Sequence, residues 1–490
     1  MRIRSECAAV REPTTTGPGR KRKKLSTLTV PAQFPAQVIP ASKKKTAKLT
    51  LWPLVAATFF MVSGGTYGTE EIVRGAGYGK GILILLLCPL LWSLPTAFMI
   101  GELSSALPVE GGYYAWVRRA MGNFWGFQEA WLSLVASIFD MAIYPTLFVA
   151  YLTRLFPWFA AGHRGVMVGL AVVTVCALMN IAGIRVVATT SLWLFFLLSA
   201  PFVLIVLLAP FKYGALAGAV TAPTNSSVDL IGGLLIAMWN YMGWDNSSTI
   251  AAEVKSPRRT YPRAMLLSVL LVALTYILPV AAVAMTGIAP SAFETGFWAD
   301  LAGMMGGPWL RVALVLGGML SAFGMFNALV MSYSRLPLAM AQDGMLPRIF
   351  AKVHPRTNAP WVAILVCAIG WALCLGLGFD RLVTLDVMLY GLSLMLEFVA
   401  LIALRVKEPK LRRPFPVPGG MWGAALIGVF PLLLLCFSVV RGEREQILGI
   451  NGLVFGLLLI GGGVLAYGIK TMLGNGRTLA QAGSSASTAD

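Results

Sequence analysis

The sequence predicts an all-α membrane protein with twelve transmembrane helices, two of them interrupted within the bilayer. Hydrophobic residues make up 57% of the 490 residues and charged residues only 12%, whereas an ordinary soluble protein has about 25% charged residues. The apolar residues gather in windows of roughly 20, the length that crosses a hydrocarbon core of about 30 Å. Two of these windows contain clusters of glycine and polar residues.

The formal net charge of +18 does not indicate a nucleic-acid-binding protein. Twelve of the 39 Lys and Arg residues lie in the first 50 residues, and most of the others lie in short gaps between apolar windows. Binding to a phosphate backbone needs a continuous basic face instead. Five of the six cysteines lie in apolar windows, and no CxxC spacing occurs. We therefore expect the cysteines to be small hydrophobic side chains.

Each of the twelve windows has the length and composition of one membrane crossing. The predicted crossings are 50–74, 80–106, 123–152, 164–182, 188–211, 230–252, 264–286, 308–340, 360–379, 382–404, 421–440 and 447–472. We expect residues 49–404 to form a ten-helix core and residues 405–472 to add helices eleven and twelve. Residues 1–48 are basic and lack an apolar stretch, and residues 473–490 are rich in Gly, Ser and Ala, so we expect both terminal segments to be disordered.

The distribution of Lys and Arg predicts the orientation in the membrane. Twenty-nine of these residues fall on the side of the N-terminus, nine fall on the opposite side, and Arg335 lies within a crossing. Cytoplasmic loops carry the excess of positive charge. We therefore expect both termini in the cytoplasm.

Helix-breaking residues interrupt the first and sixth crossings at a similar depth. The first cluster runs from Ser63 to Glu71 and the second from Trp239 to Ser248. Two interrupted helices five crossings apart indicate an inverted repeat in which freed backbone groups bind a solute at the midplane. An alternative is that the glycines only allow close helix packing. The substrate-binding candidates in these clusters are Ser63, Gly64, Gly65, Tyr67, Gly68, Trp239, Asn240, Tyr241, Gly243, Trp244 and Asp245.

Carboxylates within the crossings are further candidates, because an acid at a helix centre costs about 2.5–3.5 kcal/mol on insertion scales. Asp140 lies near the middle of the third crossing, and Tyr144 shares its helical face, so this pair could bind a substrate amine. The alternative is a buried acid satisfied by neighbouring groups. The candidates for gating or coupling are Glu70, Glu71, Glu102 and Glu253. We expect Glu129 to act as a capping or salt-bridge group, while Glu397 has no predicted role.

Enzymatic function is disfavoured by the motifs. The two histidines, His163 and His354, lie in separate loops, and no GxxxxGK[ST] phosphate loop occurs, so neither a zinc site nor ATP hydrolysis is expected. A channel or a non-transporting membrane sensor stays open as another class. Broken helices without a repeated filter sequence favour a carrier.

The chain resembles the APC superfamily of amino acid, polyamine and organocation transporters over residues 50–472. The motifs that carry the resemblance are Ser63 to Gly68, Gly101 to Pro108 followed by Glu110 to Tyr114, and Ala251 to Val254. Gly126 to Trp131 and Asp140 to Pro145 are similar to the branch of plant and protozoan polyamine uptake transporters, which is related to the L-type amino acid transporters.

This resemblance implies a leucine-transporter-type fold with a 5+5 inverted repeat and a substrate site between crossings one, three, six and eight. Ser63, Gly64 and Gly65 would meet the carboxylate of an amino acid, and Trp239 to Asp245 would supply carbonyls and an aromatic gate. The chain differs from the polyamine branch at Met242 and Gly243, where that branch has Asn and Tyr. It also lacks the lysine that several proton-coupled relatives carry in crossing five.

The functional expectation is a plasma-membrane secondary transporter that imports amino acids or polyamines by alternating access. The coupling ion would be the proton, and an amino acid exchanger of the same fold is the alternative. Apart from the substrate and the lipid bilayer, we expect no cofactor, metal or nucleic acid. No predicted outer loop contains a cysteine, so we expect no disulfide-linked subunit.

Overall fold

The computed structural model describes residues 50–109, 111–183, 186–213, 229–248, 254–444, 446–447 and 449–486. The predictions for residues 1–48 and for Glu253 fall outside these ranges. The described chain is almost entirely helical. Its helices are α1 (Leu51–Val62), α2 (Glu70–Cys88), α3 (Leu94–Ala106), α4 (Gly112–Met121), α5 (Asn123–Leu155), α6 (Arg164–Ile181), α7 (Val186–Tyr213), α8 (Leu230–Asn240), α9 (Pro257–Ala284), α10 (Phe297–Gly306), α11 (Pro308–Gln342), α12 (Trp361–Leu373), α13 (Phe379–Lys407), α14 (Gly420–Arg444) and α15 (Gly452–Ala486). The short strands β1 (Gln446–Ile447) and β2 (Ile450–Asn451) pair antiparallel.

Several helices have the length and apolar character needed to cross a bilayer. Within the described ranges nine meet both conditions, with Glu70–Ala106 counted as one kinked run. The first, sixth and ninth predicted crossings contain the shorter helices α1, α8 and α12, of 12, 11 and 13 residues. The chain is therefore a multi-pass membrane protein of the all-α class.

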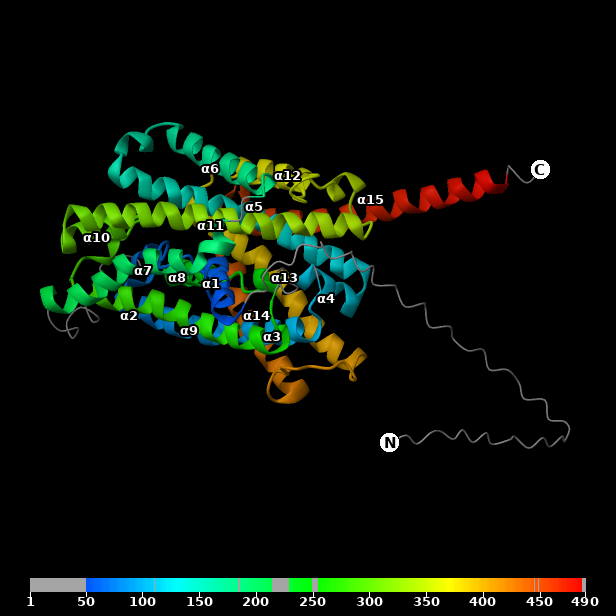
Figure 1. Cartoon of the computed structure of the whole chain (residues 1–490), viewed down its shortest axis with the longest axis horizontal. Coiled ribbons are helices and arrows are strands. Elements are labelled where there is room, and N and C mark those ends of the chain that lie inside the picture. Colours follow the sequence, from blue (N-terminus) through cyan, green and yellow to red (C-terminus); the bar gives the residue numbers. More distant parts are fainter. Residues whose placement is uncertain are drawn as a thin grey trace, which may run out of the picture. The chain divides into compact units, whose positions relative to one another are not determined.

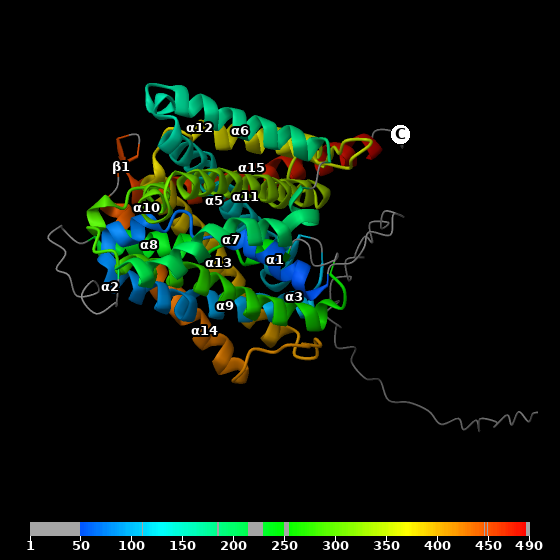
Figure 2. The same cartoon turned by 60° about the vertical axis from the view of Figure 1, so that its left-hand side comes forward.

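The interrupted helices α1 and α8 lie at the centre of the helix arrangement. In both views they are flanked on one side by α5 and α11, with α6 and α12 beyond, and on the other side by α3, α9 and α14 (Figure 1, Figure 2). Helix α5 packs along α11 and α13, and α2 packs along α8. Polar side chains on α5, α11 and α13 can therefore face the two interruptions.

Some helix boundaries differ from those predicted. Helix α2 continues from the first crossing into the second across a kink at Gly77, and a π-helical turn at Pro89–Ser93 joins it to α3. Proline lacks the amide hydrogen that a regular turn uses, which accounts for the irregularity at residue 89. Helix α15 continues to Ala486, into a segment for which no regular structure was predicted. That segment includes Leu479, Ala480 and Gln481, which have high helix propensity.

The backbone leaves helical geometry where the glycine clusters predicted an interruption. Helix α1 ends at Val62 and α2 begins at Glu70, while α8 ends at Asn240. Gly64 and Gly243 have φ angles of 61° and 86°, a region that other residues seldom adopt. A Cβ atom on Gly243 would lie 2.7 Å from the backbone carbonyl oxygen of Met61. The two interruptions therefore contact each other through their backbones.

We predict that Gly243→Ala destabilises the protein by about 1–3 kcal/mol, because the new methyl group adds backbone strain and overlaps with Met61. Gly461→Ala is the matched control, since no atom lies within 4 Å of its added Cβ. Thermal unfolding in detergent measures both variants. Equal melting temperatures would show that the close approach at Gly243 is not required.

Candidate functional site

A small central cavity lies between the ends of α1 and α8. Its volume is about 10 Å³, which holds one water molecule at most. The lining comes from α1, α5, α8 and the segment after it, α11 and α13. The lining residues are Met61, Val62, Asp140, Tyr144, Trp239, Met242, Gly243, Asn246, Tyr333, Asp386 and Tyr390.

Asp140 is one of two carboxylates in this lining and is held by three donors. Tyr144 and the Trp239 indole N–H donate to Oδ1 over 3.0 and 3.2 Å, and the Tyr333 hydroxyl donates to Oδ2 over 3.1 Å. Asp140 is only 6% exposed. The predicted pairing of Asp140 with Tyr144 on one helical face is thus present, and both side chains reach the cavity.

Asp386 on α13 is the second carboxylate in the lining and is not among the residues predicted from the sequence. Its side chain is 2% exposed, and its Oδ2 atom has no hydrogen-bond partner among the described residues. The charges that act on it are those of Asp140 and Asp245, both negative. Asp386 falls within the predicted crossing 382–404, so the same test for intramembrane acids that selected Asp140 would have found it.

Asp245 lies one hydrogen bond away from the cavity. Tyr390 lines the cavity and donates its hydroxyl to Asp245 Oδ1, and the same hydroxyl accepts the Gly243 amide over 3.2 Å. The Asn246 side chain, also in the lining, accepts from Ser332 on α11 over 2.9 Å. The segment after α8 is therefore bonded to both α11 and α13.

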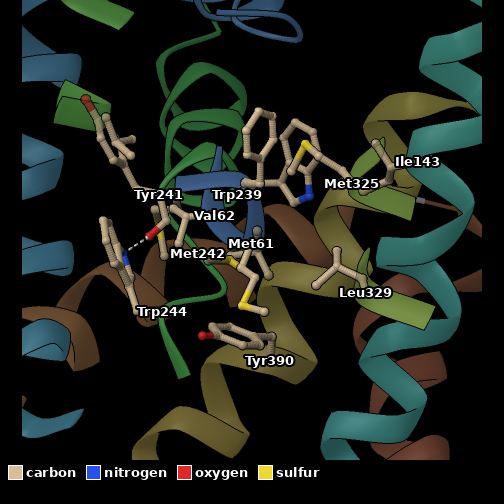
Figure 3. Close-up of a cluster of buried hydrophobic side chains, with 14 of the residues drawn as sticks. Met61, Val62, Ile143, Trp239, Tyr241, Met242, Trp244, Met325, Leu329 and Tyr390 are labelled. Carbon is tan, nitrogen blue, oxygen red and sulfur yellow. Dashed lines mark hydrogen bonds between the residues drawn. The ribbon is translucent and has the colours of Figure 1, made fainter. Parts of the chain in front are cut away.

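Trp239 is the aromatic side chain of the second cluster that faces the cavity. Its ring packs against Tyr144 and, edge-on, against Phe379 at centroid distances of 6.2 and 5.5 Å. Figure 3 shows Trp239 above Met61 and Tyr390 below it, whereas Tyr241 and Trp244 lie on the other side of Val62 and Met242. Tyr241 donates to the Leu85 carbonyl and Trp244 to the Tyr241 carbonyl.

The remaining candidates of the two clusters do not line the cavity. Ser63 Oγ accepts the Gly65 amide over 3.1 Å, and the Gly64 carbonyl accepts from Ser321 over 2.6 Å. The Asn240 amide group donates to the Ile236 carbonyl over 2.8 Å. Like Tyr241 and Trp244, six further predicted substrate-binding residues are not among the lining residues of the cavity. These six are Ser63, Gly64, Gly65, Tyr67, Gly68 and Asn240.

The N-terminus of α2 already holds a carboxylate of the protein itself. Glu70 accepts the Gly68 and Gly296 amides over 2.8 and 2.9 Å and the Tyr151 hydroxyl over 2.5 Å. The positive end of a helix is where a substrate carboxylate would bind. Here Glu70 occupies that position, and the nearby Gly65 amide is bonded to Ser63.

A larger cavity of about 410 Å³ lies next to the central one. Ile236 on α8 and Val383 on α13 line it, and Trp239 and Asp386, about one turn further along the same helices, line the central cavity. Trp239 therefore lies at the boundary between the two cavities. The charged residues of the larger cavity are Glu71, Asp229, Asp380 and Arg74.

The predicted gate residues differ in their surroundings. Glu71 pairs with Arg74 over 3.1 Å and accepts from Thr295. Glu102 forms ion pairs with Arg405 and Arg413 and accepts the Val417 amide. Glu129 was expected near a helix end with a cap or salt bridge, and this prediction is wrong. It is fully buried inside α5, where Ser133 and Ser393 donate to it.

Comparisons with known proteins identify similar sequences. The family profile described as "Amino acid permease" matches residues 55–455. The Polyamine transporter RMV1 of Arabidopsis thaliana is 33% identical over 435 residues, which cover 88% of this chain and 87% of that protein. The Polyamine transporter PUT1 of Oryza sativa subsp. japonica is 34% identical over 415 residues, which cover 84% of this chain and 77% of that protein.

We predict that Glu70→Ala strongly lowers the melting temperature, because it leaves buried donors without an acceptor at about 1–3 kcal/mol each. Glu294→Ala is the control, since its side chain is 66% exposed in the neighbouring loop. Thermal unfolding in detergent compares the two. A melting temperature for Glu70→Ala equal to that of Glu294→Ala would contradict the structural role of Glu70.

Proposed function

The chain belongs to the amino acid permease family, and from this premise we propose that it carries polyamines across the membrane by alternating access. Family membership makes it a transporter of small molecules rather than an enzyme. The observation that carries the choice of substrate is the pair Asp140 and Asp386 in a cavity whose described lining residues include no Lys, Arg or His. A ligand with several ammonium groups complements this site.

The charge of the site favours a polyamine over an amino acid. Asp245 adds a third buried carboxylate through Tyr390, and the aromatic lining residues Tyr144, Trp239 and Tyr333 suit alkylammonium groups. An amino acid also needs a donor for its carboxylate. Two amides of the first interruption, those of Gly65 and Gly68, are already bonded to Ser63 and Glu70. The polyamine transporters RMV1 and PUT1 among the relatives support the same choice.

Alternating access follows in this proposal from the small size of the central cavity. A volume of about 10 Å³ cannot hold a diamine, so substrate can enter only after helices move. The proposed fold is a 5+5 inverted repeat with twelve crossings, in which the interrupted first and sixth crossings open the cavity to one side at a time. The short helices α1 and α8 support this assignment.

The proposed location is the plasma membrane, with both termini in the cytoplasm. The described basic residues Arg118, Arg119 and Arg413 then face the cytoplasm, and the acidic cavity around Glu71 and Asp380 faces outward. A membrane potential that is negative inside favours import of a cation by about 2.3 kcal/mol per charge for each 100 mV. The proposed coupling ion is the proton, either imported with the substrate or exchanged for it.

We predict saturable uptake of labelled putrescine and spermidine into liposomes that contain the purified protein, with much weaker uptake of leucine. Asp386→Asn and Asp140→Asn should each raise the KM for putrescine about 10- to 100-fold, which corresponds to the loss of one charged hydrogen bond of about 1.5–3 kcal/mol. Glu408→Gln is the control, because Glu408 pairs at the surface with Arg119.

Three results would contradict this proposal. Saturable uptake of leucine without uptake of either polyamine would show an amino acid transporter. Non-saturable flux without counterflow would show a channel, and a protein that moves none of these solutes would have to be assigned to the sensor class.

A further inference from the structure

Two further buried acids, Glu129 on α5 and Glu397 on α13, lie between the central cavity and the helix ends that carry Arg119 and Arg405. Both side chains are 0% exposed, and neither lines the cavity. Glu129 lies about three helical turns from Asp140, and Glu397 lies about three turns from Asp386, or roughly 16 Å along each helix. These acids are separate from the site proposed for the substrate.

Most carboxyl oxygens of Glu129 and Glu397 accept no hydrogen bond from the described residues. Ser133 and Ser393 donate to Glu129 Oε1 over 2.9 and 3.2 Å, and the two serine hydroxyls lie 2.8 Å apart. Glu129 Oε2 and both oxygens of Glu397 have no hydrogen-bond partner in the part of the chain that the structure describes. The serines thus join α5 to α13 at this level, but they do not compensate a second negative charge.

No described cation compensates Glu397 either. The elements packed against α13 are α3, α4, α5, α8, α14 and α15. Among the side chains that the structure describes, the ionisable groups of these elements, with that of Asp245 after α8, are Glu102, Tyr113, Tyr114, Arg118, Arg119, Glu129, Asp140, Tyr144, Tyr151, Arg154, Cys436, Tyr467 and Lys470. The acids Asp245 and Glu129 lie close enough to act on Glu397 electrostatically, and both carry negative charge when ionised.

The described Arg and Lys side chains nearby are engaged elsewhere. Arg118 pairs with Asp343, Arg119 with Glu408, Arg154 with Asp300 and Arg405 with Glu102, while Lys407 donates to the Ala120 carbonyl and Lys470 lies against Met345. An ionised carboxylate in this position would be buried, unpaired and repelled by two other acids. Such a group requires a bound cation or a proton.

A proton neutralises a fully buried carboxyl group directly, by forming an O–H bond with one of its oxygens. Resting on the proposed function, we infer that the Glu129–Glu397 pair holds one proton in the polyamine-free carrier and releases it when a polycation binds at Asp140 and Asp386. On release, the O–H bond of the carboxyl group breaks, and the proton passes to water on the side to which the carrier is open. The carboxylate then remains on the protein.

The direction of coupling follows from the sign of the charges. Like charges repel, so a negative charge on Asp245, which is bonded to Tyr390 on α13, gives preference to an uncharged group at Glu397. A polycation in the central cavity offsets that negative charge and removes part of this preference. Binding of substrate and binding of the proton thus weaken each other reciprocally. Competition of this kind produces exchange, in which a polyamine moves inward and a proton moves outward.

Liposomes that contain the wild-type protein and a trapped pH indicator test this inference. Addition of external spermidine should make the lumen more alkaline as labelled spermidine enters. In Glu397→Gln and Glu129→Gln, spermidine counterflow should persist while the pH change falls at least fivefold. Glu408→Gln, which removes a surface carboxyl group paired with Arg119, should behave like the wild type.

Infrared spectroscopy of the purified protein provides a readout that does not depend on transport. At neutral pH the wild type should show a carboxylic acid C=O band that spermidine removes and that Glu397→Gln lacks. An acidified lumen would overturn the exchange mode, and an undiminished pH change in Glu397→Gln would overturn the site. If the wild type transports no polyamine, the proposed function fails. The proton site is then tested by the infrared band alone: a band at neutral pH that Glu397→Gln lacks supports the site, and the absence of the band from the wild type overturns it.

Discussion

A carboxylate buried at membrane depth needs a counterion, hydrogen-bond donors or a proton. This constraint determines which side chains surround each buried acid of the protein. Glu102 meets it with Arg405 and Arg413. Glu70 and Asp140 meet it with three donors each. Acids whose oxygens all accept hydrogen bonds or ion pairs hold helices together. Asp386 and Glu397 keep oxygens without a partner among the described residues, so each can bind a substrate ammonium group or a proton.

The interrupted helices make this arrangement possible. Where α1 and α8 stop, their backbones touch through Gly243 and Met61, and side chains of α5, α11 and α13 converge on the gap. Helix α13 carries Asp386, Tyr390 and Glu397 at spacings of one and two turns, so these groups follow one face. One helix therefore connects the proposed substrate site with the proposed proton site.

Sequence reasoning located most of the long apolar helices and both interruptions, because long apolar windows and clustered glycines are local signals. Asp140, Tyr144 and Trp239, which it proposed as substrate-binding residues, lie in the lining of one cavity, and their binding role stays a prediction. It did not foresee that Glu70 would occupy the N-terminus of α2, nor that Glu129 would lack a salt bridge, because both depend on partners distant in sequence, such as Gly296 and Ser393. Asp386 could have been found from its position alone, whereas its bare oxygen required the packed helices.

A structure of the protein with bound spermidine tests the central claim most directly. The account predicts ammonium groups within hydrogen-bond distance of Asp386 Oδ2 and Asp140, with the chain of the ligand against Trp239 and Tyr333. A ligand bound away from both acids would contradict it. So would an amino acid whose carboxylate displaces Glu70 from the amide of Gly68.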